Sequence, residues 1–108
     1  MPGYVGTLLD IHDHDRFREY LKGVGPSLAR HGGRIVLRGP IVDVAEGKLD
    51  TREDTRLVMI EFDSLENARE WYESEEYQEL IKLREEPVAS TTAFFIDGID
   101  LRSAPAGP

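Results

Sequence analysis

Three residues of this chain are the strongest candidates for catalysis: His31, Arg38 and Glu61. Histidine exchanges protons near neutrality, which suits general acid–base chemistry. An arginine can hold a carboxylate or an enolate, and a glutamate can take up a proton. Each residue also has a structural interpretation. His31 can cap a helix C-terminus, and Arg38 with Glu61 can form a cross-strand ion pair worth about 0.2–1 kcal/mol.

A second group of candidates lies in the segment Glu61–Arg84, where aromatic rings and a cation recur at helical spacing. We interpret Trp71, Tyr72, Tyr77 and Arg84 as candidate substrate-binding residues. A cation on the apolar stripe of a helix is costly unless it is paired. We therefore expect Arg84 to pair with a carboxylate of the chain or, failing that, with an anionic ligand. The tyrosines can equally be core residues, and Trp71 can line a dimer contact instead of a pocket.

These alternatives make different structural demands. An enzyme requires a closed pocket lined by at least three of the polar candidates. A docking protein requires that the same groups satisfy one another and leave no cavity. The polar candidates are His31, Arg38, Glu61, Tyr72, Tyr77 and Arg84.

Several kinds of site are disfavoured by the sequence. It has no cysteine, which excludes disulfides, thiolate metal ligands and cysteine nucleophiles. The segment His12–Asp15 alternates His and Asp, but it lies where a helix needs a cap, and metal ligands must converge. We interpret it as a cap with solvated neighbours. There is no phosphate-binding loop, dinucleotide fingerprint or heme-ligand signature beyond a lone histidine, so we expect no cofactor and no metal.

The composition indicates one acidic domain of 108 residues with a net charge of −8. Nucleic acids and anionic membranes are poor partners for such a chain. Residues 61–86 hold ten Asp or Glu against three Lys or Arg, which indicates a solvated helix face or a docking surface for a basic partner. The chain shows no signal peptide and no apolar stretch that could span a bilayer, so we expect a cytoplasmic protein.

Hydrophobic periodicity predicts alternating strands and helices. Phe17, Leu21, Val24 and Leu28 give one apolar helix face, which Pro26 should kink or restart. We expect a mobile tail at 101–108. The predicted elements are a strand at 4–11, a helix at 14–30, strands at 34–39 and 56–62, a helix from 64 with a break near 73–75, and a strand at 90–97.

This order, strand–helix–strand–strand–helix–strand, is typical of the ferredoxin-like α+β fold, a four-stranded antiparallel sheet with helices on one face. We expect one such domain at residues 1–100. The predicted strands carry more apolar side chains than one sheet face can take. We therefore expect a homodimer in which two sheets face each other.

Five motifs run through the chain: His31-Gly32-Gly33-Arg34, Leu37-Arg38-Gly39, Glu61-Phe62-x-Ser64-Leu65-Glu66-x-Ala68, Trp71-Tyr72-x-Ser74-x-Glu76-Tyr77-Gln78 and Leu83-Arg84. Together they resemble the domain-of-unknown-function family 1330 over about residues 3–99. The resemblance implies a dimeric α+β barrel. Its superfamily also holds cofactor-free antibiotic-biosynthesis monooxygenases, muconolactone isomerase and heme-dependent peroxidase relatives. Glu85-Glu86-Pro87 departs from the small residues that often follow the arginine.

The first functional hypothesis is a cofactor-independent enzyme that acts on a small polar or aromatic metabolite, in secondary metabolism or in the breakdown of small acids. Cyclisation, isomerisation, lactonisation or oxygenation would suit such a site. The alternative is a non-catalytic dimeric protein that binds a small ligand or serves as an accessory protein. A third hypothesis is a structural partner that docks through its acidic helices.

Overall fold

The computed structural model describes residues 1–52 and 54–99. Its element order confirms the expected ferredoxin-like arrangement, and the predicted tail at 101–108 lies outside the described residues. The elements are β1 (Gly3–Ile11), α1 (His14–Arg30), β2 (Arg34–Pro40), β3 (Thr55–Phe62), α2 (Leu65–Glu73), α3 (Glu75–Ile81) and β4 (Ala89–Asp97).

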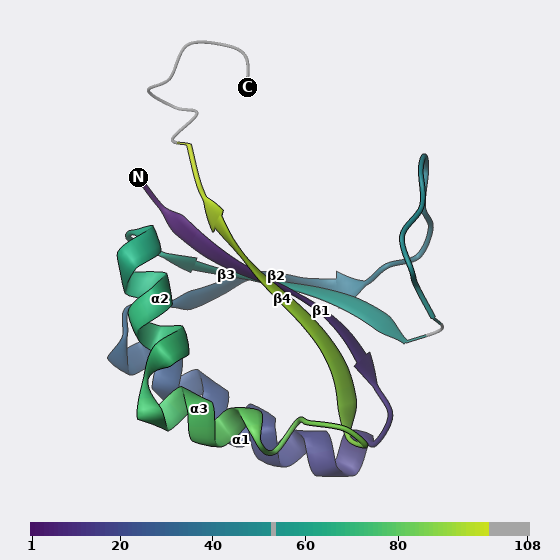
Figure 1. The fold of residues 1–108 in the computed structure, drawn as a ribbon, viewed down its shortest axis with the longest axis horizontal. Helices are drawn as coiled ribbons and strands as arrows, with labels where there is room; N and C mark the ends of the chain where they lie inside the picture. Colours follow the sequence, from purple (N-terminus) through teal and green to yellow (C-terminus); the bar gives the residue numbers. More distant parts are fainter. Residues whose placement is uncertain (53, 100–108) are drawn as a thin grey trace.

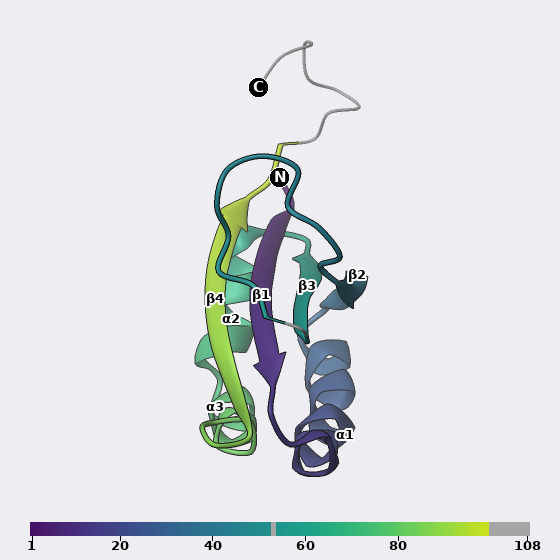
Figure 2. The same cartoon turned by 90° about the vertical axis from the view of Figure 1, so that its right-hand side faces the viewer.

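The four strands form one antiparallel sheet in the order β2-β3-β1-β4. All three helices lie on the same side of this sheet and leave its other face open (Figures 1 and 2). Because side chains alternate between faces, β1 turns Val5, Thr7, Leu9 and Ile11 toward the helices, and all four are buried.

Hydroxyl and carboxylate caps start the helices where the sequence predicts. Asp13 accepts a hydrogen bond from the Arg16 N–H, and Ser74 accepts one from the Tyr77 N–H. Ser74 lies at the junction of α2 and α3, which confirms the expected break there. The expected restart of the first helix is wrong, because α1 runs through Pro26 without interruption.

Aromatic rings form the centre of the core. Phe62 and Trp71 are fully buried, and their ring centroids lie 5.5 Å apart. The Trp71 and Tyr77 centroids are only 3.9 Å apart. These rings join β3 to α2 and α3, so the α2–α3 break is itself held in place by the core.

The open sheet face carries apolar side chains that the helices do not cover. Leu37, Phe94 and Ile96 are 51%, 37% and 37% exposed. Phe94 lies over Gly6 of the neighbouring strand, where an added Cβ would clash with the ring, so the glycine permits this close approach. After β2, residues 41–52 contain no strand and project from the body of the molecule (Figure 1).

Among residues 1–52 and 54–99, none of the helices combines the length and apolar character that crossing a bilayer requires.

Candidate functional site

A cavity of about 290 Å³ lies between α1 and the sheet. Most of its lining is apolar, with a few polar groups, which is the usual composition of a small-molecule site. The lining comes from β1 (Thr7, Leu9, Ile11), α1 (Phe17, Tyr20, Leu21, Val24), β2 (Ile35, Arg38), β3 (Arg56, Val58, Ile60) and α3 (Tyr77).

A β-bulge turns Arg38 into this cavity. Ile35 pairs with Ile60 and Leu37 pairs with Met59, so Val36 is an extra residue on β2. Strict alternation would place Arg38 on the open face with Arg34. The bulge reverses the faces beyond Val36, so that Leu37 points to the open face and Arg38 lines the cavity.

Arg56 is a second cation in the cavity wall, and we did not predict it as a site residue. It shares the helix-facing side of β3 with Val58 and Ile60. The alternation of β3 carried this signal, because Arg56 falls on the same side as residues expected to be core. Its side chain is half-buried, and its Nε has no hydrogen-bond partner in the described structure.

Behind the cavity, Arg84 is only 6% exposed. Its Nη2 lies 3.4 Å from the Tyr77 hydroxyl, and its guanidinium lies 5.5 Å from the centroid of the Tyr20 ring. Among the described residues, no carboxylate lies within ion-pair distance of it. The expected pairing with a carboxylate of the chain is therefore wrong: two phenols surround the cation instead.

The Tyr20 and Tyr77 hydroxyls are 2.8 Å apart, and both residues line the cavity. Burial raises the pKa of Tyr20 well above its usual range, and the neighbouring Tyr77 raises it further. Burial lowers the pKa of Arg84, but the two phenols raise it by more, so the net shift is upward. The arginine is thus a permanent cation, and Tyr20 keeps its proton at physiological pH.

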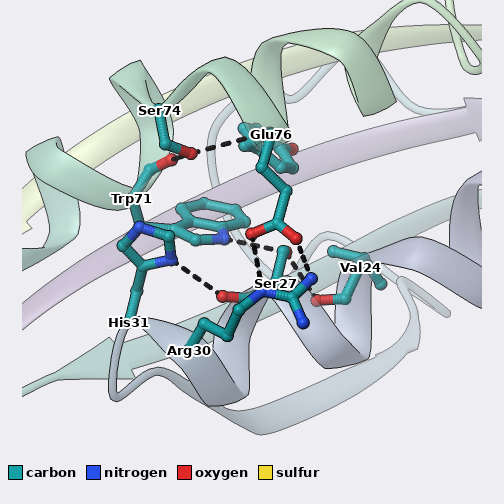
Figure 3. A network of polar contacts seen from close by, with 8 residues as sticks. Val24, Ser27, Arg30, His31, Trp71, Ser74 and Glu76 are labelled. Carbon is teal, nitrogen blue, oxygen red and sulfur yellow. Dashed lines mark hydrogen bonds and ion pairs between the residues drawn. The ribbon is translucent and has the colours of Figure 1, made fainter.

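His31 and Trp71 belong to a different, structural network (Figure 3). The His31 Nδ1 lies 2.9 Å from the Ser27 carbonyl oxygen at the end of α1. The Trp71 Nε1 donates to the Ser27 hydroxyl at 3.1 Å, and that hydroxyl donates to the Val24 carbonyl at 2.7 Å. Neither His31 nor Trp71 lines the cavity.

Glu61 lies on the open face of the sheet, away from the cavity. It forms an ion pair with Arg34, its register partner, and its Oε2 accepts a hydrogen bond from Tyr4 at 2.8 Å. The expected pair between Arg38 and Glu61 is therefore wrong, because the bulge sends Arg38 to the opposite face. Tyr72, half-buried, packs edge-on against Phe95, with centroids 5.6 Å apart, and does not line the cavity.

The structure thus brings together only part of the predicted site. Of the six polar candidates, Arg38 and Tyr77 line the cavity, and Arg84 contacts Tyr77 from behind. Two lining residues are fewer than the three that the enzyme hypothesis requires, and this shortfall favours the non-catalytic alternative. The catalytic roles of His31 and Glu61 and the binding roles of Trp71 and Tyr72 stay predictions.

The His12–Asp15 segment serves as a helix start. Asp13 caps α1, as expected. Within the part of the chain that the structure describes, no three His, Cys, Asp or Glu side chains gather in a way that could hold a metal ion.

Residues 2–99 match the family described as Domain of unknown function (DUF1330). The chain belongs to the DUF1330 family. This confirms the resemblance carried by the five motifs. A comparison with proteins of curated function gave no match.

Several solved structures share the fold of this DUF1330 chain. RPA0582, a protein of unknown function from Rhodopseudomonas palustris, is 19% identical, with a TM-score of 0.72 over 91% of this chain and 82% of that one. SnoaB, a cofactor-independent oxygenase from Streptomyces nogalater, is 7% identical, with a TM-score of 0.64 over 95% and 98%. A dimeric ferredoxin-like protein of unknown function from Thermobifida fusca is 13% identical, with a TM-score of 0.59 over 90% and 91%.

The raised pKa of Tyr20 predicts that the free energy of unfolding depends on pH in the alkaline range. Above the ordinary value of 10.0, the unfolded chain releases the Tyr20 proton while the folded chain retains it. Proton release then favours unfolding, so the free energy of unfolding falls as pH rises, by up to about 1.4 kcal/mol per pH unit from this group. Tyr20→Phe should remove this contribution. Urea denaturation at a series of alkaline pH values measures it, and an unchanged slope in the variant would refute the assignment.

Proposed function

We propose that this protein is a small dimeric α+β barrel enzyme that acts without a cofactor on a small polar or aromatic metabolite bound beneath α1. Reactions that suit the site are cyclisation, isomerisation, lactonisation and oxygenation. Secondary metabolism and the breakdown of small acids are the settings in which we expect it. The observation that carries the proposal is the pair of phenols in the cavity wall, with a buried guanidinium behind it.

The hydroxyl hydrogens of the two tyrosines determine which hydrogen bonds the pair can offer to a ligand. Arg84 donates to the Tyr77 oxygen, and the two phenols share one hydrogen between their oxygens. Two hydroxyl hydrogens are present and one serves the bond between the tyrosines, so the other is available to the cavity. The nearby cation strengthens that donor by polarising the phenol.

A fixed donor in an apolar cavity is suited to stabilise an oxygen that gains negative charge. Enolates and phenolates of this kind arise in all four proposed reaction classes. A donor already in place needs no reorganisation during the reaction. We therefore assign oxyanion stabilisation to Tyr77 and Tyr20, with Arg84 as the positioning residue behind them. His31 and Glu61, our predicted proton carriers, lie outside this cavity.

The fold offers a precedent for such chemistry. SnoaB, described as a cofactor-independent oxygenase, shares this fold at 7% identity, which supports the proposal at the level of the scaffold.

A specific observation favours the alternative, a non-catalytic protein that binds a small ligand. None of the described residues lining the cavity is a histidine or a carboxylate. The usual general bases are therefore missing from the wall, and a ligand could be held there without being transformed.

We also propose that a second copy of the chain covers the open sheet face. The exposed Leu37, Phe94 and Ile96 lie on this face, and a solvated surface of this kind is costly. Structural neighbours from Thermobifida fusca and Bacteroides fragilis are described as dimeric proteins with a ferredoxin-like fold.

The enzyme proposal is tested by incubating the protein in air with a panel of small phenols and enolisable carboxylic acids, with products followed by mass spectrometry. We expect turnover of at least one compound. Tyr77→Phe should lower kcat about 10²- to 10³-fold, as the loss of an oxyanion donor does in other enzymes. Tyr4→Phe, which removes a phenolic hydroxyl on the open face, is the matched control and should keep the parent rate. Binding of a compound without any product would favour the alternative, and equal rates in the parent and Tyr77→Phe would reject the assignment of the donor.

The dimer is tested by sedimentation velocity at micromolar concentration. We expect the mass of two chains for the parent and of one chain for Leu37→Asp or Phe94→Asp, since a buried unpaired carboxylate opposes association. Leu83→Asp places the same charge at an exposed leucine after α3 and should leave the dimer intact. A parent that sediments as one chain contradicts the proposal.

A further inference from the structure

Two arginines face the same cavity from neighbouring strands. Arg38 lies opposite Val58 in the β2–β3 pair, and Arg56 is the next residue of β3 on the same face. The two are therefore diagonal neighbours, whose Cβ atoms lie about 7–8 Å apart in an antiparallel pair. Their side chains are long enough to reach a common group between them.

Neither arginine has a carboxylate partner among the residues that the structure describes. The ion pairs of the described residues involve Arg18, Arg30, Arg34 and Arg52, but not Arg38 or Arg56. The Nε of Arg56 is in addition sealed from solvent with no acceptor. A buried N–H without an acceptor is unfavourable, and in a charged group more so. Arg56 is therefore an uncompensated cation in the cavity wall, and an anion bound in the cavity would supply the missing charge.

The cavity wall is positively charged, whereas the whole protein is acidic. The chain carries a net charge of −8, yet none of the described residues that line the cavity is acidic and two are arginines. Two like charges on one wall repel each other. An anion bound between the two guanidiniums would attract both of them. The planar guanidinium of arginine also matches an oxyanion in two-point contacts.

We infer that the ligand of this cavity is an organic anion, whose carboxylate or other oxyanion group lies between Arg38 and Arg56 and whose apolar body extends toward Tyr20 and Tyr77. The volume of about 290 Å³ is at the small end of ligand sites, so it suits a body of one or two rings. The inference deepens the proposed function, on which it rests for the identity of the site, by naming the chemical class of the substrate.

The test compares an anion with its neutral isostere. Titration calorimetry with 2-naphthoate and 2-naphthamide, which differ in charge but hardly in shape, isolates the contribution of the arginines. We expect the carboxylate to bind at least about tenfold more tightly than the amide, a difference of about 1.4 kcal/mol. Adding 2-naphthyl phosphate as a third probe shows whether the site prefers a carboxylate or a phosphate ester.

Variants assign the preference to the two residues. Arg38→Gln and Arg56→Gln should each remove most of the preference for naphthoate and leave the affinity for naphthamide unchanged. Arg18→Gln removes a guanidinium that pairs with Asp15 on the exposed side of α1, and it should behave like the parent. Arg38 is an exposed residue of an edge strand, so its variant keeps the test informative if Arg56→Gln does not fold.

The inference is overturned if the amide and both anions bind equally, or if the preference for anions survives in both glutamine variants. This outcome is separate from the failure of the proposed function. Equal binding of acid and amide leaves catalysis by the phenols open, whereas tight binding of naphthoate by a protein that turns over none of the tested compounds supports the anion site and argues against the enzyme.

Discussion

One extra residue in an edge strand determines where the polar groups of this protein meet. Val36 is the bulged residue of β2, and it reverses the faces of the strand beyond it. Without that reversal, Arg38 would lie on the open face opposite Leu57, and Leu37 would fill space beneath α1. With it, the open face gains an apolar side chain and the cavity gains a cation. The candidate binding site and the candidate dimer surface are thus both products of the same local irregularity.

The second constraint is a buried cation that has no carboxylate within ion-pair distance in the described part of the chain. Arg84 is held by the hydroxyl of Tyr77 and the ring of Tyr20, and the latter contact adds a cation–π attraction. A buried charge with so few partners costs stability, and such costs are commonly met at functional sites. The same is true of the unpartnered Nε of Arg56. Together these groups give an acidic protein an interior that is cationic and rich in hydrogen-bond donors.

Much of the fold follows from local patterns in the sequence. The apolar spacing of α1, the caps at Asp13 and Ser74 and the β-rich segment at β3 each place an element within a few residues of where it lies.

The site was harder to predict from the sequence, because it depends on which face of the sheet each strand residue occupies. The motif around Arg38 does not reveal the bulge at Val36, so the sequence pointed to a pair with Glu61 that the register forbids. Arg56 was within reach of an alternation argument, because it shares one face of β3 with the apolar Val58 and Ile60. The contact of Arg84 with Tyr20 depends on the meeting of α1 with the segment after α3, which no short pattern reveals, whereas its other partner, Tyr77, lies in the same segment of helical spacing.

Arg38 and Arg56 line a largely apolar cavity and have no carboxylate partner among the described residues, so we infer that they serve a ligand rather than the fold. The most direct measurement is the free energy of unfolding of the double variant Arg38→Leu, Arg56→Leu, obtained by urea denaturation without ligand. Replacing buried ionic groups by apolar residues of similar size is often stabilising. Arg56 is half-buried with a sealed Nε whereas Arg38 is exposed, so we predict that the double variant is more stable than the parent and that Arg56→Leu accounts for most of the gain. A double variant less stable than the parent would show that the arginines support the fold. It would contradict the inference that they serve to bind an anionic ligand.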